Sequence, residues 1–135
     1  MSAVLVDTDV VSYAFRQASE YDLYRDLLSE RDLFLSFAMF AELVRGTLKA
    51  SWGQRRRDRL TEFIQSRFAI LNTNRQTCIE WAAVHDEARR IGRVMGCADA
   101  WVAATAIAAD VPLVSHNRRH FEFLDRLDLI SFAPQ

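Results

Sequence analysis

The stretch Ala3-Val4-Leu5-Val6-Asp7-Thr8-Asp9 decides the fold. Its unbroken apolar run predicts a strand buried on both faces, as in a parallel sheet. The run leads directly into two carboxylates and a hydroxyl. Ligands of open α/β sheets bind outside the carboxyl ends of the strands, which is where we expect Asp7. A partly desolvated carboxylate there needs a partner, and we predict that this partner is a metal ion.

A simpler role for the same residues stays open. Asp and Thr directly after a strand are common N-caps of the next helix, which apolar spacing predicts over residues 10–17. The strand and Asp7 alone do not distinguish a helix cap from a binding site.

Length and composition predict one globular domain over residues 1–135. Of the 135 residues, 50% are hydrophobic and 26% charged, an ordinary globular mixture. The net charge of −1 gives no overall attraction to nucleic acid, so RNA binding would need a local patch. Lys49 is the only lysine among 17 basic residues. Arginine suits phosphate binding, although a GC-rich coding bias produces the same skew.

The chain shows no sign of export or membrane insertion. Cys78 and Cys97 lack the spacing of metal ligands. The first residues lack the charged lead and apolar core of a secretory signal. No apolar run approaches the roughly 18 residues of a membrane span. We therefore expect a reduced, cytoplasmic, soluble protein with no membrane partner.

Strands and helices alternate along the rest of the chain. We expect strands over residues 32–36, 68–71, 112–115 and 129–132, and helices over residues 21–28, 37–49, 73–95 and 97–108. Thr73 and Gln76 match a capping box at the start of the longest helix. The alternation predicts an α/β three-layer domain with a central, mostly parallel sheet flanked by helices.

Four polar residues share one kind of position in this pattern. Asp7 and Asn117 follow strands, and Glu42 and Asp99 lie near the beginnings of helices. These places lie along one edge of a parallel sheet, so the side chains can converge. A divalent cation removes the repulsion among converging carboxylates, and such clusters suit phosphodiester chemistry. Simpler explanations are a solvated Glu42 paired with Arg45, and an Asp99 that complements its helix dipole.

The ordered set of motifs resembles the PIN domain, and more narrowly the VapC-type toxins of prokaryotic toxin–antitoxin systems. The resemblance covers essentially the whole chain. The matching segments are the strand with Asp7-Thr8-Asp9, Ala41-Glu42-Leu43, Ala98-Asp99-Ala100-Trp101-Val102-Ala103-Ala104-Thr105-Ala106, and Leu113-Val114-Ser115-His116-Asn117. It implies an endoribonuclease that hydrolyses RNA phosphodiester bonds with Mg²⁺, or with Mn²⁺ as a substitute.

The resemblance also implies roles for single residues. Asp7, Glu42 and Asp99 match the acidic metal ligands of the family. Asn117 matches a fourth position that is often Asp, which would make it a neutral ligand or a water-positioning group. Ser115 matches a hydroxyl that supports the first acid.

Two positions depart from the family pattern. Thr8 and Asp9 match a turn that usually reads Asp-Thr-Asn, and Asp9 would restore a charge that Asn117 lacks. His120-Phe121 stands where many members carry Asp-Phe. These differences bear on metal affinity and stoichiometry, while the three acids are retained.

VapC-like proteins are typically homodimers inhibited by a cognate antitoxin that lays a helix across a groove. Early aromatic residues could form that groove, or else the core and the dimer interface: Tyr13, Phe15, Tyr21, Tyr24, Phe37 and Phe40. Arg55, Arg56 and Arg57 belong to the most basic stretch of the chain. They form either a solvated helix face or contacts to the RNA backbone.

Parts of the sequence pattern are compatible with two other functions. A haloacid-dehalogenase-like phosphatase also begins with a buried strand and Asp-x-Asp, but it needs a lysine and an acidic pair beyond Ser115. A catalytically inactive PIN-like RNA-binding or interaction module is favoured by Asn117 and disfavoured by the three retained acids. The elbow motif of serine hydrolases, phosphate loops and dinucleotide motifs are absent.

Overall fold

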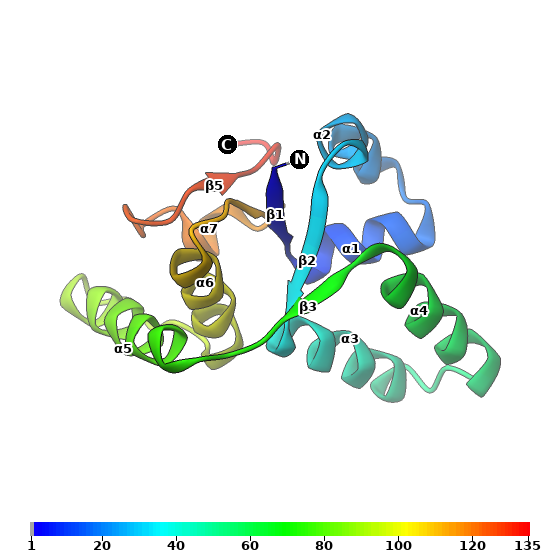
Figure 1. The fold of residues 1–135 in the computed structure, drawn as a ribbon, viewed down its shortest axis with the longest axis horizontal. Helices are drawn as coiled ribbons and strands as arrows, with labels where there is room; N and C mark the ends of the chain where they lie inside the picture. Colours follow the sequence, from blue (N-terminus) through cyan, green and yellow to red (C-terminus); the bar gives the residue numbers. More distant parts are fainter. Residues whose placement is uncertain (1) are drawn as a thin grey trace.

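A computed structural model describes residues 2–135 and contains a five-stranded sheet with the order β3-β2-β1-β4-β5 (Figure 1). The strands are β1 (Ala3–Val6), β2 (Asp32–Ser36), β3 (Ala69–Leu71), β4 (Leu113–Val114) and β5 (Leu129–Ile130). Every neighbouring pair is parallel, so the expected mostly parallel sheet is parallel throughout the described residues. The last three strands are each one or two residues shorter than predicted.

Helices cover both faces of the sheet, which confirms the three-layer prediction. They are α1 (Thr8–Arg16), the 3₁₀ helix η1 (Ser19–Leu23), α2 (Arg25–Ser29), α3 (Phe37–Lys49), α4 (Gln54–Arg67), α5 (Arg75–Arg90), α6 (Cys97–Ala109) and α7 (Arg118–Phe121). Figure 1 shows α1, α2 and α4 on one side of the strands and α5 and α6 on the other. The strand order reverses direction at β1, and right-handed crossovers then place the two sets of helices on opposite faces.

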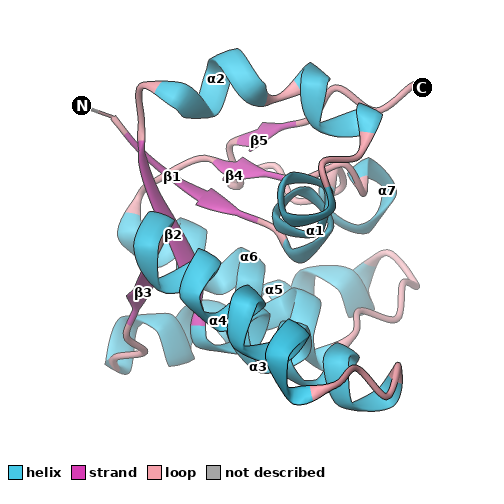
Figure 2. Cartoon of the chain, turned by 90° about the vertical axis from the view of Figure 1, so that its right-hand side faces the viewer, coloured by secondary structure: helices cyan, strands magenta, loops and turns pink. Residues whose placement is uncertain are grey.

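Strand β1 and helix α6 form the centre of the core. Val4, Leu5 and Val6 have no exposed surface, as expected for a central strand covered on both faces. Helix α6 is buried along most of its length, and its alanines let it approach the sheet closely. The small, apolar side chains of α6 account for this burial. Figure 2 shows the strands between α2 and the group of helices that contains α3, α4, α5 and α6.

None of the helices in residues 2–135 combines the length and the apolar character needed to cross a membrane.

Helix α5 begins and ends at other residues than predicted. Its N-cap is Asn74, whose Oδ1 accepts the Thr77 backbone N–H at 3.0 Å. The capping box is therefore formed by Asn74 and Thr77, one residue later than the predicted Thr73 and Gln76. Thr73 and Asn74 are both good N-cap residues, so the sequence alone does not choose between them. The helix ends at Arg90 instead of Met95, and Gly92 then takes the left-handed backbone that glycine tolerates (φ 74°). Helix α1 starts at Thr8, two residues earlier than predicted.

The two capping interpretations predict different mutational effects. Asn74→Ala should lower the free energy of unfolding by about 1 kcal/mol, because the Thr77 amide loses its acceptor. Thr73→Ala should change it by less than about 0.5 kcal/mol, as for other surface sites. Urea unfolding followed by circular dichroism measures both. A larger loss in Thr73→Ala than in Asn74→Ala would contradict the capping seen here.

Candidate functional site

Asp7 lies at the carboxyl end of β1 and is only 7% exposed. Its Oδ1 accepts the Thr8 backbone N–H at 2.8 Å and caps helix α1. Its Oδ2 accepts the hydroxyl of Ser115 at 2.8 Å, from the residue that follows β4. Asp7 therefore caps a helix and also lies at the sheet edge where the site was predicted.

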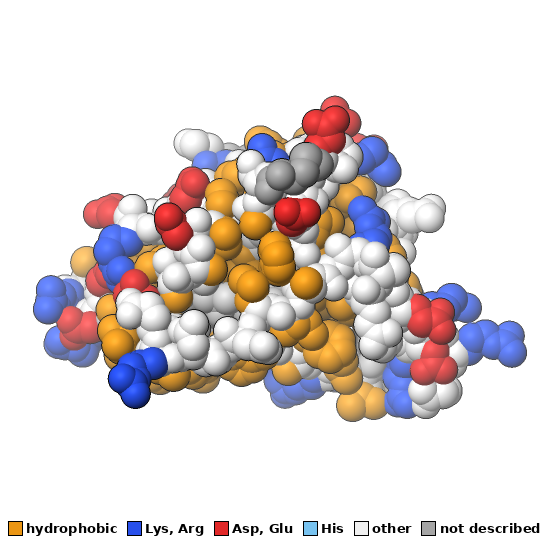
Figure 3. Space-filling model, viewed as in Figure 1, with side chains coloured by type: hydrophobic (Ala, Val, Ile, Leu, Met, Phe, Trp, Pro, Cys, Tyr) orange, Lys and Arg blue, Asp and Glu red, His pale blue; other side chains and the backbone are white. Residues whose placement is uncertain are grey.

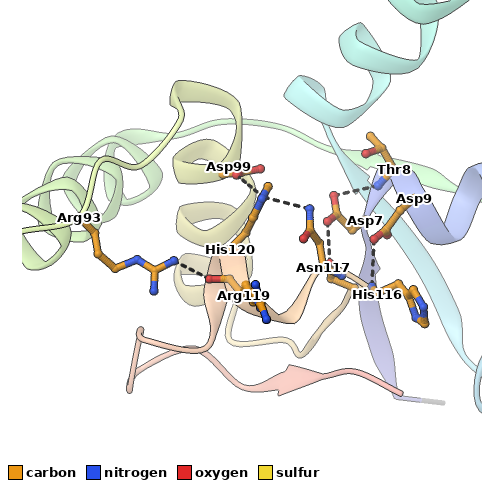
Figure 4. A network of polar contacts seen from close by, with 10 residues as sticks. Asp7, Thr8, Asp9, Arg93, Asp99, His116, Asn117, Arg119 and His120 are labelled. Atoms are coloured by element: carbon orange, nitrogen blue, oxygen red, sulfur yellow. Dashed lines mark hydrogen bonds and ion pairs between the residues drawn. The ribbon is translucent and has the colours of Figure 1, made fainter. Parts of the chain in front are cut away.

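The turns after β1 and β4 are joined by further hydrogen bonds (Figure 4). Asp9 accepts the Val10 N–H at 2.7 Å with one oxygen and the His116 N–H at 3.0 Å with the other. The Asn117 N–H donates to the Ser115 hydroxyl at 3.0 Å. Asp9 thus holds the backbone of both turns in place, a role that its carboxylate fills with two acceptor oxygens.

Behind these turns lies Tyr24, one of the early aromatic residues predicted to form a groove, the core or the dimer interface, and it is fully buried. The Tyr24 hydroxyl is hydrogen-bonded to Nδ1 of His116 at 2.7 Å and accepts the Phe132 N–H at 3.0 Å. Tyr24 therefore connects the early helices to the turn after β4 and to the C-terminal segment. Its aromatic character predicted burial, but nothing in the local pattern indicated a polar partner.

Asp99 lies in the first turn of α6 and faces α7 (Figure 4). Nδ1 of His120 is 2.8 Å from Asp99 Oδ2 and 3.0 Å from the side-chain amide nitrogen of Asn117. The predicted residues Asp99 and Asn117 are thus linked through a histidine that was noted only as a departure from the family. Its neighbour Arg119 accepts, with its backbone carbonyl, the Arg93 guanidinium at 2.6 Å.

Glu42 lies on the second turn of α3 and lines a cleft of about 360 Å³. Thr8 and Asp9 line the same cleft, together with Trp52. Glu42 therefore lies on the same cleft as the turn between β1 and α1, as expected for residues at one edge of the sheet. Trp52, in the connection between α3 and α4, is a further residue of the cleft that the sequence pattern did not indicate.

The carboxylates at this edge affect one another's protonation. Burial raises the pKa of Asp7, the Ser115 and Thr8 hydrogen bonds lower it, and the charge of Asp99 raises it again. Burial also raises the pKa of Glu42, to which the charges of Asp7 and Asp99 add. Burial and the charge of Asp7 raise the pKa of Asp9 to about 7. Negative charge is thus concentrated in a desolvated region, the condition that a cation relieves.

The donor set fits a divalent cation. Three carboxylates and one amide supply the oxygen ligands that Mg²⁺ and Mn²⁺ take in proteins. In residues 2–135 no three His, Cys, Asp or Glu side chains already stand in a metal-binding arrangement. Ligation by Asp7, Glu42 and Asp99 therefore requires side-chain rotation towards a common point, which a bound ion would favour by cancelling their repulsion.

The basic stretch lies at the start of α4, near the cleft. The Arg56 guanidinium stacks over the Trp52 ring at 3.7 Å, and Trp52 lines the cleft with Glu42. Arg57 donates to the side chain of Gln54. Arg55 is exposed on the same helix. Of the three arginines, Arg56 is the one that the structure connects to the cleft.

A family model described as PIN domain matches residues 4–127. A curated relative named Ribonuclease VapC1, from Haemophilus influenzae, is 27% identical over 120 residues, which cover 87% of this chain and 89% of that protein.

Solved structures share the fold at lower sequence identity. The VapBC-1 structure from nontypeable Haemophilus influenzae has a TM-score of 0.84 at 23% identity, covering 96% of this chain and 97% of that chain. The VapBC2 structure from Rickettsia felis, bound to a DNA fragment from their promoter, has a TM-score of 0.82 at 23% identity, covering 96% and 98%.

The raised pKa of Asp7 predicts that this carboxylate destabilises the metal-free protein at neutral pH. The unfolded chain releases the proton near the ordinary value of 3.8, and the folded protein holds it to higher pH. Stability should therefore fall as pH rises through this window. Asp7→Asn should flatten the fall and raise the free energy of unfolding at pH 7.5 by about 1–2 kcal/mol, since burial costs a charged carboxylate more than a neutral amide of the same shape, even with two donors in place.

Urea unfolding in EDTA from pH 4.5 to 8 measures this effect. Asp125→Asn, at an exposed position, is the matched control and should follow the wild-type profile. An Asp7→Asn protein that is less stable than wild type at pH 7.5 would show that the helix cap outweighs the desolvation.

Proposed function

Because the chain belongs to the PIN domain family, we propose that it is a metal-dependent endoribonuclease, the toxin of a toxin–antitoxin pair. The observation that carries this proposal is the concentration of Asp7, Glu42 and Asp99 at one sheet edge, where the charge of Asp99 adds to the raised pKa of Asp7 and the charges of Asp7 and Asp99 add to that of Glu42. Relatives named Ribonuclease VapC and structural neighbours titled VapBC support the substrate class and the biological role. An RNA substrate fits action in the cytoplasm.

In this proposal Asp7, Glu42 and Asp99 hold Mg²⁺ or Mn²⁺, and Asn117 assists as a neutral group. The ion supplies polarisation of the scissile phosphate and a bound water of lowered pKa. Ser115 and the Thr8 amide fix the Asp7 carboxylate, so that its remaining lone pairs point to one place.

Arginines on both sides of the acids supply contacts to the RNA backbone. Arg56 is held flat on Trp52 at the cleft, and Arg55 and Arg57 precede and follow it in the first turn of α4. On the other side, Arg93 is fixed by the Arg119 carbonyl and by the Phe123 ring, 4.5 Å from its guanidinium carbon. Guanidinium groups held in this way lose little entropy on meeting a phosphate.

A groove of about 860 Å³ next to the site is the place for the antitoxin helix. It is lined from α1, η1, α2 and α4, with Phe15, Tyr21 and Phe63 as its aromatic residues and Arg25, Arg59 and Arg67 as its basic ones. An amphipathic helix with an acidic flank fits an apolar floor bordered by arginines. Of the early aromatic residues, Phe15 and Tyr21 line this groove, whereas Tyr24 belongs to the core.

A second copy of the chain is the proposed partner of an apolar face. Figure 3 shows apolar side chains gathered over the middle of the face on which β2, β3 and α6 are seen. Ile70 of the edge strand β3 and Phe37 after β2 are 42% and 41% exposed. Burial of such residues favours a homodimer. Ile70→Arg should therefore yield a monomer in light scattering, whereas Ile91→Arg on the α5 end should not.

The phosphatase alternative does not fit membership of the PIN family. The inactive-module alternative stays distinct, because it predicts neither metal binding nor cleavage. One experiment separates it from the nuclease.

Purified protein should cut total cellular RNA into discrete fragments with Mn²⁺ or Mg²⁺ and should not cut it in EDTA. Asp99→Asn should reduce the rate by at least about 100-fold, because the site loses a charged ligand and the electrostatic stabilisation that it supports. Gel electrophoresis of the products and a rate on a labelled fragment measure both effects.

Asp125→Asn, prepared in parallel, controls for a contaminating nuclease and should cleave like wild type. Equal cleavage by Asp99→Asn and wild type would overturn the assignment. No cleavage together with no Mn²⁺ binding by wild type would favour the inactive module.

A further inference from the structure

His120 makes two contacts that one ring nitrogen cannot satisfy at once. Nδ1 is 2.8 Å from Asp99 Oδ2 and 3.0 Å from the Asn117 amide nitrogen. An imidazole Nδ1 either carries a proton, which it donates to Asp99, or offers a lone pair, which accepts from Asn117. The metal-free arrangement therefore leaves one of the two contacts without a shared proton.

A cation resolves this conflict. An amide nitrogen and oxygen exchange places by a simple flip, so Asn117 can present its oxygen where the nitrogen now stands. Asp99, His120 and Asn117 then each offer a lone pair to one point. The 2.8 and 3.0 Å separations show that the three side chains are close enough for one cation to be held by all of them.

The surroundings of His120 leave its ring open to such an ion. The side chain is 48% exposed and that of Asp99 is 30% exposed, so solvent and ions reach them. The neighbouring Arg93 guanidinium donates to the Arg119 backbone carbonyl and not to the His120 ring (Figure 4).

We propose that His120 is a nitrogen ligand of the metal site, and that it makes the site favour Mn²⁺ and other transition ions over Mg²⁺. Mg²⁺ takes oxygen ligands almost exclusively, whereas imidazole binds first-row transition ions well. The inference rests on the proposed metal site and names its metal selectivity. It places His120, with Asp99 and Asn117, on the α6–α7 side of the ion.

Electron spin echo envelope modulation of the Mn²⁺-loaded protein tests this directly, since it detects a coordinated nitrogen without any substrate. Wild type should show nitrogen modulation. His120→Asp should bind Mn²⁺ without that modulation, and its preference for Mn²⁺ over Mg²⁺ in calorimetric titration should fall about tenfold.

His116→Gln is the matched control, because its ring contacts Tyr24 and its backbone alone contacts Asp9. It should keep the nitrogen modulation. Mn²⁺ binding by wild type without nitrogen modulation, or modulation that persists in His120→Asp, would overturn the role of His120 and leave the proposed nuclease standing. No Mn²⁺ binding by wild type would overturn the proposed metal site together with this inference.

Discussion

The buried carboxylate of Asp7 is the constraint on which the structure of the site depends. It lies at the end of the central strand, between β2 and β4. A carboxylate in that place is costly unless donors reach it. Its donors are the adjacent Thr8 amide and the Ser115 hydroxyl, 108 residues away along the chain. Strand β4 has to pair with β1 in one register, Leu5 opposite Leu113, before both donors are in place.

Capping and metal binding are compatible roles for this carboxylate. Each of its oxygens has two lone pairs, and each accepts one hydrogen bond from the protein. The N-terminus of α1 also favours a negative charge beside it. The helix therefore keeps Asp7 oriented without using up its capacity as a ligand. Asp9 likewise accepts one hydrogen bond on each oxygen, but its donors are the backbone amides of Val10 and His116, so that its carboxylate joins the two turns.

Much of the fold follows from local pattern. The apolar run before Asp7 predicts the central strand, and alternating strands and helices predict a parallel sheet. The positions of Asp7, Glu42 and Asp99 along one edge follow from that topology. Cap positions were less predictable, because Thr73 and Asn74 have similar preferences and only the fold selects Asn74. The end of α5 depends on a backbone turn at Gly92 that helical periodicity does not encode.

The side-chain partners of the three histidines could not be predicted from the sequence, because they depend on tertiary packing. His85 packs edge-to-face against Trp81 at 4.3 Å between ring centroids, within one helix. The His116 ring is hydrogen-bonded to the Tyr24 hydroxyl. The His120 ring, by contrast, lies within ion-pair distance of a carboxylate, that of Asp99. All three have the same intrinsic chemistry, and no periodic pattern separates them. The residue types at this edge come from the sequence, whereas the packing of α6 against α7 decides which nitrogen meets which oxygen.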